Sequence, residues 1–168
     1  MSDKYYAGIG SRVLPDMIMW GDMMKIARRF KKKGWTLRSG GAMGSDTAFE
    51  QGAAEACEIY LAWQQRYLGK GKHFIGPELP NWNEAMKLGE KYHPAWNKLT
   101  DGAKALHARN SYIILGNDLQ TPVSLVICYT KDGTEIGGTA QGMRMARDYG
   151  IPIFNLFFNN VKEKLKNF

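Results

Sequence analysis

Residues 35–50, with the sequence WTLRSGGAMGSDTAFE, constrain the fold more than any other stretch of the chain. An apolar run typical of a short strand leads into a turn with three glycines, and then into residue types that favour the start of a helix. Glycine lets the backbone approach a ligand closely, and the free N–H groups at a helix start favour an anion. The pattern therefore predicts a phosphate-binding turn formed by Ser39, Gly40, Gly41, Gly44, Ser45 and Asp46.

The polar residues of this turn also have simpler roles open to them. Asp46 is of a type that caps helices, and we favour that role over one as a catalytic base. Thr47 and Glu50 have the spacing of a capping box. A single glycine turn of this kind is usually structural. Recurrence of the pattern elsewhere in the chain favours ligand binding instead.

The first recurrence is near the N-terminus. Residues 5–10 predict a buried strand that ends at Gly8 and Gly10, followed by Ser11 and Arg12 in a loop. Valine stands where the dinucleotide-binding fingerprint has its third glycine, so this motif alone is a weak signal.

The second recurrence follows a nearly continuous apolar run at residues 123–129, which is typical of a central parallel strand. Gly137, Gly138 and Thr139 lie ahead of a helix predicted from about 140 to 149. The order of strand, glycine turn and helix start is thus repeated.

The chain as a whole alternates strands with helices, which predicts an α/β, Rossmann-like parallel sheet of about five strands with helices on both faces. Strands are expected at the start of 35–50 and at 5–10, 59–63, 123–129 and 151–156, and a long loop at 64–82 is interpreted as a lid. If the first strand lies between the second and 123–129, the three turns converge on one crevice at the carboxyl ends of the strands.

Composition sets the broad class. The 168 residues suit one domain, 1–168, with 44 % hydrophobic and 23 % charged residues, and no apolar run is long enough to span a membrane. Without a leader pattern at the N-terminus, we expect a cytoplasmic protein. The net charge of +7 indicates anionic partners, although solvated helix faces explain many of the lysines. Cys57 and Cys128 are expected to be buried free thiols, and the scattered histidines predict no metal site.

Several side chains are candidates to contact a ligand. Asn110 falls on the inward stripe of a predicted helix, and Arg109 beside it reaches the edge of that stripe, where the crevice opens. Arg12, Arg38 or Arg109 would pair with phosphate, and Trp63 or Trp96 would stack on a base, although either tryptophan is more often part of a core.

Four segments of the chain resemble the SLOG superfamily, which joins the DNA-processing protein A family with the Lonely-guy phosphoribohydrolases. They are 8–12 (GIGSR), 39–46 (SGGAMGSD), 108–110 (ARN) and 137–139 (GGT). The resemblance spans nearly the whole chain and is closest to small DNA-processing-A-like proteins carried by bacteriophages. It implies a Rossmann-like nucleotide-binding domain.

The resemblance also bears on catalysis. In Lonely-guy enzymes a catalytic glutamate follows the glycine turn, whereas here Gln141 stands near that position. An amide cannot support cleavage of an N-glycosidic bond as a carboxylate does. Glu135 is a weak catalytic candidate that resembles the nucleophile of deoxyribosyltransferases, and we favour a solvated loop glutamate. These residues favour a binding protein over an enzyme, and an enzyme stays open as an alternative.

The leading hypothesis is a pocket for a nucleotide-derived small molecule, an ADP-ribose-type or cyclic nucleotide signal, with no cofactor and a possible homo-oligomer. If the gene is carried by a phage, such a pocket would sequester a host immune signal. The alternatives are a phosphoribohydrolase or deoxyribosyltransferase acting on nucleoside monophosphates, and single-stranded DNA binding like that of DNA-processing protein A.

Overall fold

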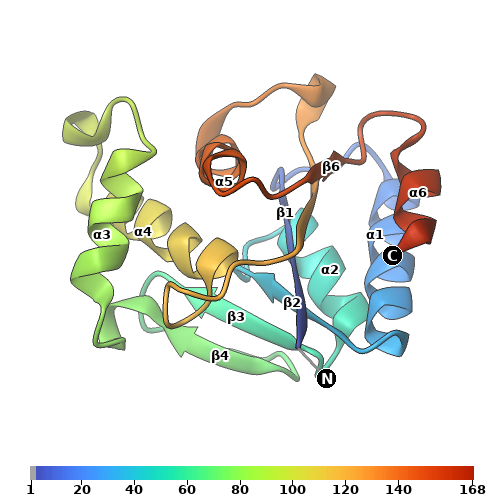
Figure 1. The fold of residues 1–168 in the computed structure, drawn as a ribbon, viewed down its shortest axis with the longest axis horizontal. Helices are drawn as coiled ribbons and strands as arrows, with labels where there is room; N and C mark the ends of the chain where they lie inside the picture. Colours follow the sequence, from blue (N-terminus) through green and yellow to red (C-terminus); the bar gives the residue numbers. More distant parts are fainter. Residues whose placement is uncertain (1–2) are drawn as a thin grey trace.

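A six-stranded parallel sheet forms the centre of the computed structural model, which describes residues 3–168 (Figure 1). Its strands are β1 (Lys4–Gly10), β2 (Trp35–Ser39), β3 (Cys57–Leu61), β4 (Lys72–Ile75), β5 (Leu125–Tyr129) and β6 (Ile153–Asn155). They lie in the order β4-β3-β2-β1-β5-β6, and every neighbouring pair is parallel. The first strand thus lies between β2 and β5, which is the condition under which the turns were expected to converge.

Helices cover both faces of this sheet, as the alternating pattern predicted. They are α1 (Met17–Lys32), α2 (Ser45–Ala53), α3 (Trp82–Lys91), α4 (Asp101–Leu115), α5 (Gly137–Asp148) and α6 (Val161–Lys164). Short 3₁₀ turns occur at Gly76–Glu78, Trp96–Lys98, Lys131–Gly133 and Leu165–Asn167. The helices α1, α2 and α6 pack on one face, and α3, α4 and α5 pack on the other (Figure 1).

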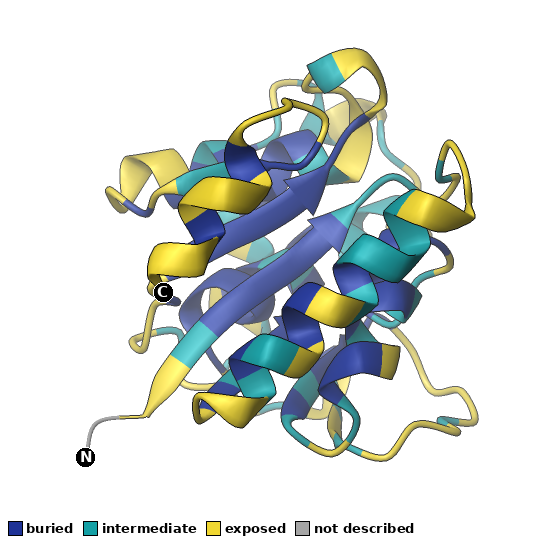
Figure 2. Cartoon of the chain, turned by 90° about the vertical axis from the view of Figure 1, so that its right-hand side faces the viewer, coloured by how far each residue is buried: buried dark blue, intermediate teal, exposed yellow. Residues whose placement is uncertain are grey.

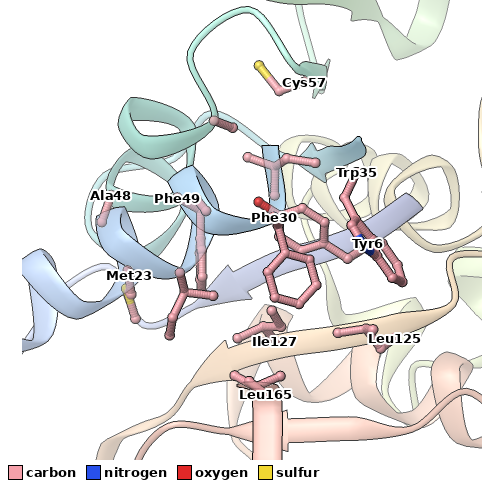
Figure 3. Close-up of a cluster of buried hydrophobic side chains, with 14 of the residues drawn as sticks. Tyr6, Met23, Phe30, Trp35, Ala48, Phe49, Cys57, Leu125, Ile127 and Leu165 are labelled. Carbon is pink, nitrogen blue, oxygen red and sulfur yellow. The ribbon is translucent and has the colours of Figure 1, made fainter. Parts of the chain in front are cut away.

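The central strands are buried along most of their length (Figure 2), and their alternate side chains enter two separate cores on opposite faces of the sheet. On β1, Tyr6 points into the core beneath α1 and α2, where its ring lies 4.8 Å from that of Phe30 (Figure 3). The next residue, Ala7, points into the core beneath α3, α4 and α5. This two-sided burial explains why β5 has almost no polar residues.

Residues 64–82 correct the sequence-based interpretation most clearly. The predicted long loop contains β4, which pairs with β3 from Glu58 opposite Lys72 to Leu61 opposite Ile75. An edge strand that begins with exposed Lys72 and His73 lacks the apolar pattern of the central strands. The sheet consequently has six strands instead of five. The interpretation of the segment as a lid is wrong for Lys72–Ile75, which form β4.

Two boundaries also differ from prediction in ways that affect the site. The strand predicted at 59–63 is β3, which ends at Leu61, so that Trp63 lies beyond it. The helix predicted from about 140 begins at Gly137. Gly137, Gly138 and Thr139 therefore form the first turn of α5 and do not precede it.

Cys57 and Cys128 are buried free thiols, as predicted. Between residues 3 and 168, no helix combines the length and the apolar character that a membrane span requires.

Candidate functional site

A cavity of about 720 Å³ lies at the carboxyl ends of β1 and β5, between α4 and α5. This is the topological switch point of the sheet, where open α/β folds bind ligands. The cavity is lined by Ile9, Gly10, Ser11, Arg12, Ala42, Asp46, Ala103, Leu106, His107, Arg109, Asn110, Ile113, Ile114, Thr130, Lys131, Asp132, Thr134, Ile136, Gly138, Thr139 and Gly142. It brings together eight of the residues that the sequence singled out: Gly10, Ser11, Arg12, Asp46, Arg109, Asn110, Gly138 and Thr139.

The glycine turn between β2 and α2 already holds an anion that belongs to the protein. The Asp46 carboxylate accepts the Ala42 N–H at 3.2 Å and is also hydrogen-bonded by the Gly40 backbone. Its exposed fraction is 6 %, and burial raises the pKa of this carboxyl to about 6, against the opposing charge of Arg109. The backbone N–H groups of this turn, which were predicted to bind phosphate, are thus directed at the Asp46 carboxylate.

Two predicted cap interactions in this turn are wrong. The N-cap residue of α2 is Gly44, which makes no side-chain cap, so Asp46 does not serve as the cap. Thr47 donates its hydroxyl to the Ala42 carbonyl, and Glu50 accepts the Tyr67 hydroxyl, so no capping box forms. Neither side chain is free to cap, because each is drawn into a longer-range contact.

Arg109 links α4 to this turn from within the protein. Its side chain is 7 % exposed, and its Nη1 donates to the backbone carbonyls of Gly40 and Tyr60, the latter at 3.0 Å. A Cβ atom at Gly40 would overlap the guanidinium. Gly40 is therefore needed for the close approach of Arg109, and the geometry makes Arg109 a brace between three elements as well as part of the cavity wall.

The turns that follow β1 and β2 are packed directly against each other. The Ser45 N–H and hydroxyl both donate to the Ser11 carbonyl, at 3.1 and 2.9 Å. A Cβ at Gly10 or Gly44 would meet backbone carbonyls, at Tyr129 and Arg12 respectively. Gly44 has a φ of +80°, which glycine adopts without strain. These glycines allow close contact between turns, and Gly8, Ser39, Gly40, Gly41, Gly44 and Ser45 do not line the cavity.

The start of α5 has no side chain among the described residues that accepts its backbone N–H groups, whereas Asp46 accepts N–H groups of the turn at the start of α2. Its N-cap residue, Ile136, makes no side-chain cap, and its first turn contains no acidic residue. Nothing lies within 4 Å of a Cβ built at Gly137 or Gly138. Gly138 and Thr139 line the cavity, so the unpaired N–H groups of this first turn are available to an anion there.

Two exposed cations, Arg12 and Lys131, lie at the cavity. Among the described residues neither is within salt-bridge distance of a carboxylate. Asp132 is the exposed acid on the same wall. Unpaired cations beside an open helix start favour a negatively charged ligand group.

A polar network joins α4 to α5 behind this opening. The Asn110 Nδ2 donates to the Gly138 carbonyl at 3.2 Å and to Gln141 Oε1 at 3.0 Å. Gln141, which stands where the resemblance places a catalytic glutamate, is fully buried and does not line the cavity. Asn110 thus finds polar partners, as its inward position required.

His107 lines the cavity, although it was not predicted from the sequence as a site residue. It lies three residues before Asn110 on α4, so helical spacing from that residue was the signal that could have identified it. Burial, followed by the neighbouring charges of His93, Arg144 and Arg109, lowers the pKa of His107 to about 4. The imidazole is therefore neutral at pH 7.

Five other predicted residues lie outside the cavity lining: Arg38, Trp63, Trp96, Glu135 and Gly137. Arg38 donates to Glu58 at 3.0 Å and packs 3.8 Å from the centre of the Tyr5 ring. Glu135 is ion-paired with Arg147, whose hydrogen bonds lower the pKa of the carboxyl. Trp63 is half exposed after β3, and Trp96 lies against Gly89 of α3. Base stacking by either tryptophan would have to occur outside the cavity.

Comparison with known proteins places the fold. No protein-family model and no curated protein matches the chain. Among solved structures, the chain is similar to DNA processing protein A from Helicobacter pylori, described for its mode of single-stranded DNA binding. The TM-score is 0.58 at 21 % sequence identity, and the match covers 90 % of this chain but only 64 % of that chain. The chain therefore shares the Rossmann-like α/β fold of DNA processing protein A.

Proposed function

We propose that the chain binds single-stranded nucleic acid and that one nucleotide unit occupies the cavity between α4 and α5. The observation that carries this proposal is the open start of α5, which faces a cavity with two cations, Arg12 and Lys131, that pair with no carboxylate in the described part of the chain. A phosphate at this position would receive backbone N–H groups and charge-assisted hydrogen bonds. The fold likeness supports the choice of ligand, because the similar structure is described for single-stranded DNA binding.

The remaining cavity wall suits the other half of a nucleotide. Leu106, Ile113 and Ile136 provide apolar surface, and Ile136 is 77 % exposed. An exposed apolar side chain at the rim of a cavity gains from covering by a flat base, since apolar contact removes area from water. Single strands are bound by this combination of cationic and apolar surface.

Fluorescence anisotropy with a labelled oligothymidylate tests the proposal. Arg12→Ala and Lys131→Ala should each weaken binding by roughly tenfold and lower the salt dependence by about one released counterion. The matched control is Arg28→Ala, because Arg28 is exposed on the outer side of α1, has no ion pair among the described residues and lies outside the cavity lining. Equal losses in all three variants would show attraction by net charge alone and contradict the proposed site.

A free nucleotide-derived molecule, such as an ADP-ribose-type or cyclic nucleotide signal, is the second candidate. The cavity volume of about 720 Å³ favours it, because pockets for compact ligands fall in the range of roughly 300–1,000 Å³. Mass spectrometry of small molecules that remain bound through purification, followed by competition against the labelled oligomer, separates the two. A mononucleotide that binds tightly while oligomers do not would favour this candidate.

Hydrolysis of an N-glycosidic bond has weaker support. Gln141 is buried outside the cavity lining, and Glu135 is held by Arg147. Release of free base from nucleoside monophosphates, followed by chromatography, is the direct measurement, and turnover lost in Glu135→Gln would favour the enzyme over both binding functions.

A further inference from the structure

Two buried polar atoms beside the cavity have no hydrogen-bond partner that meets standard geometry among the described residues. They are Nε2 of Gln141 on α5 and Nδ1 of His107 on α4. Gln141 is fully buried, and His107 is 8 % exposed. Burying an unpaired polar atom costs about 1–3 kcal/mol, so two such atoms on packed helices call for an explanation.

The orientation of the Gln141 amide follows from its neighbours. A backbone carbonyl can only accept, so the group of Asn110 that faces the Gly138 carbonyl must be its NH₂. The same NH₂ faces Gln141, which must present its oxygen there, at 3.0 Å. The NH₂ of Gln141 is thereby turned the other way and needs an acceptor.

His107 lies three residues before Asn110 on the same side of α4, and its Nδ1 is the other buried atom without a partner, so it can supply that acceptor. A neutral imidazole carries its proton on one nitrogen and accepts on the other. The neighbouring His93, with its ring centre 4.4 Å away, uses its own Nδ1 to accept the Ala95 N–H. The other nitrogen of His93 therefore carries a proton and cannot accept one from His107.

We propose that Gln141 donates to His107 Nδ1, so that the proton of His107 is held on Nε2, and that this N–H is the donor offered to an uncharged acceptor on the ligand, such as a nucleobase carbonyl. Gln141 is then a positioning residue, and His107 is a ligand-binding residue. The ligand part rests on the proposed function, whereas the choice of tautomer depends only on the protein.

Nitrogen-15 NMR of the ligand-free protein at pH 7 tests the tautomer. The expected spectrum shows His107 with an unprotonated Nδ1 and a protonated Nε2. Gln141→Glu presents a carboxylate oxygen in place of the NH₂, so the proton should move to Nδ1. Gln141→Met removes the donor at similar volume and should give a mixture of tautomers. A wild-type spectrum with the proton on Nδ1 would overturn the proposal, whether or not either variant folds.

Oligonucleotide affinity tests the role of the donor. His107→Phe keeps the ring but removes the N–H, and should weaken binding of oligothymidylate by roughly tenfold. An abasic oligomer with the same phosphates should bind this variant and the wild type equally. Equal weakening for both oligomers would show a disturbed cavity and overturn the donor role. Failure of the wild type to bind any oligomer would overturn the proposed function and the ligand contact, while the NMR result would still decide the tautomer.

Discussion

Replacing Arg109 by alanine should destabilise the protein strongly. The substitution removes a buried guanidinium that donates to the carbonyls of Gly40 and Tyr60. It also removes the positive charge beside the buried Asp46 carboxylate. The substitution leaves two buried carbonyls and the Asp46 carboxylate without compensation, and each group left unsatisfied costs about 1–3 kcal/mol, so the total loss should reach about 3–5 kcal/mol.

A loss of this size lowers the melting temperature by roughly 6–20 °C in a protein of this length. Urea denaturation followed by circular dichroism gives the change in the free energy of unfolding directly. Arg28→Ala is the control, because it deletes an exposed arginine that makes no ion pair in the described part of the chain, and its effect should stay within about 0.5 kcal/mol.

The decrease in the free energy of unfolding caused by Arg109→Ala should also depend on pH. Burial has raised the pKa of Asp46 to about 6 from 3.8, so the folded state favours the protonated acid. Without Arg109 the pKa of Asp46 rises further, because the cation that favours the carboxylate is gone. The destabilisation relative to wild type should consequently be smaller at pH 5 than at pH 8.

One result would refute this reasoning. If Arg109→Ala unfolds at the wild-type urea concentration but binds oligonucleotide much more weakly, the guanidinium acts on the ligand and its contacts to Gly40 and Tyr60 contribute little. Arg109→Lys sharpens the distinction, since lysine keeps the charge but loses the planar fork that reaches both carbonyls. It should recover only part of the lost stability.

Four further substitutions test other parts of the site. Gly10→Ala places a Cβ against the backbone carbonyl at the end of β5 and should cost about 1–3 kcal/mol, whereas Gly138→Ala faces open space and should leave the melting temperature within a few degrees of wild type. Asp46→Asn removes an acid whose pKa is raised in the folded state, a contribution fully present below about pH 4 and lost as pH rises through 6. Wild-type stability, measured relative to this variant by urea denaturation, should therefore fall by about 2 kcal/mol between pH 4 and pH 8. Glu135→Gln breaks only the partly exposed pair with Arg147 and should change oligonucleotide affinity less than twofold by anisotropy.

The sheet could be predicted because burial on both faces leaves a strong mark on composition. Residues 123–129 are almost wholly apolar, and the strand they predict is β5, buried along its whole length. The strand β4 has no such mark, because Lys72 and His73 are exposed at the edge of the sheet. Its four residues are held by pairing with β3, which is a long-range interaction that local pattern does not contain.

The position of the cavity could also be predicted, but the partners of its charged residues could not. Glycine turns at the carboxyl ends of parallel strands indicated the crevice, and this indication did not depend on the role of each glycine. Arg109 and Gly40 are 69 positions apart, and only the folded chain shows that the guanidinium contacts that turn. From a single sequence it cannot be predicted whether an arginine near a cavity binds a ligand or donates to a backbone carbonyl.

The contrast between the starts of α2 and α5 explains why one glycine turn is filled and the other is open. In α2 the second residue is Asp46, whose short side chain reaches back to the turn and accepts its N–H groups. In α5 the second residue is Gly138, and the first turn has no acid to play that part. A phosphate approaching the turn of α2 would meet a buried carboxylate, so like charge and occupied donors both oppose it. At α5 the N–H groups have no partner among residues 3–168, and the two nearby cations Arg12 and Lys131 outnumber the one exposed acid, Asp132, so electrostatics direct an anion to this end of the cavity.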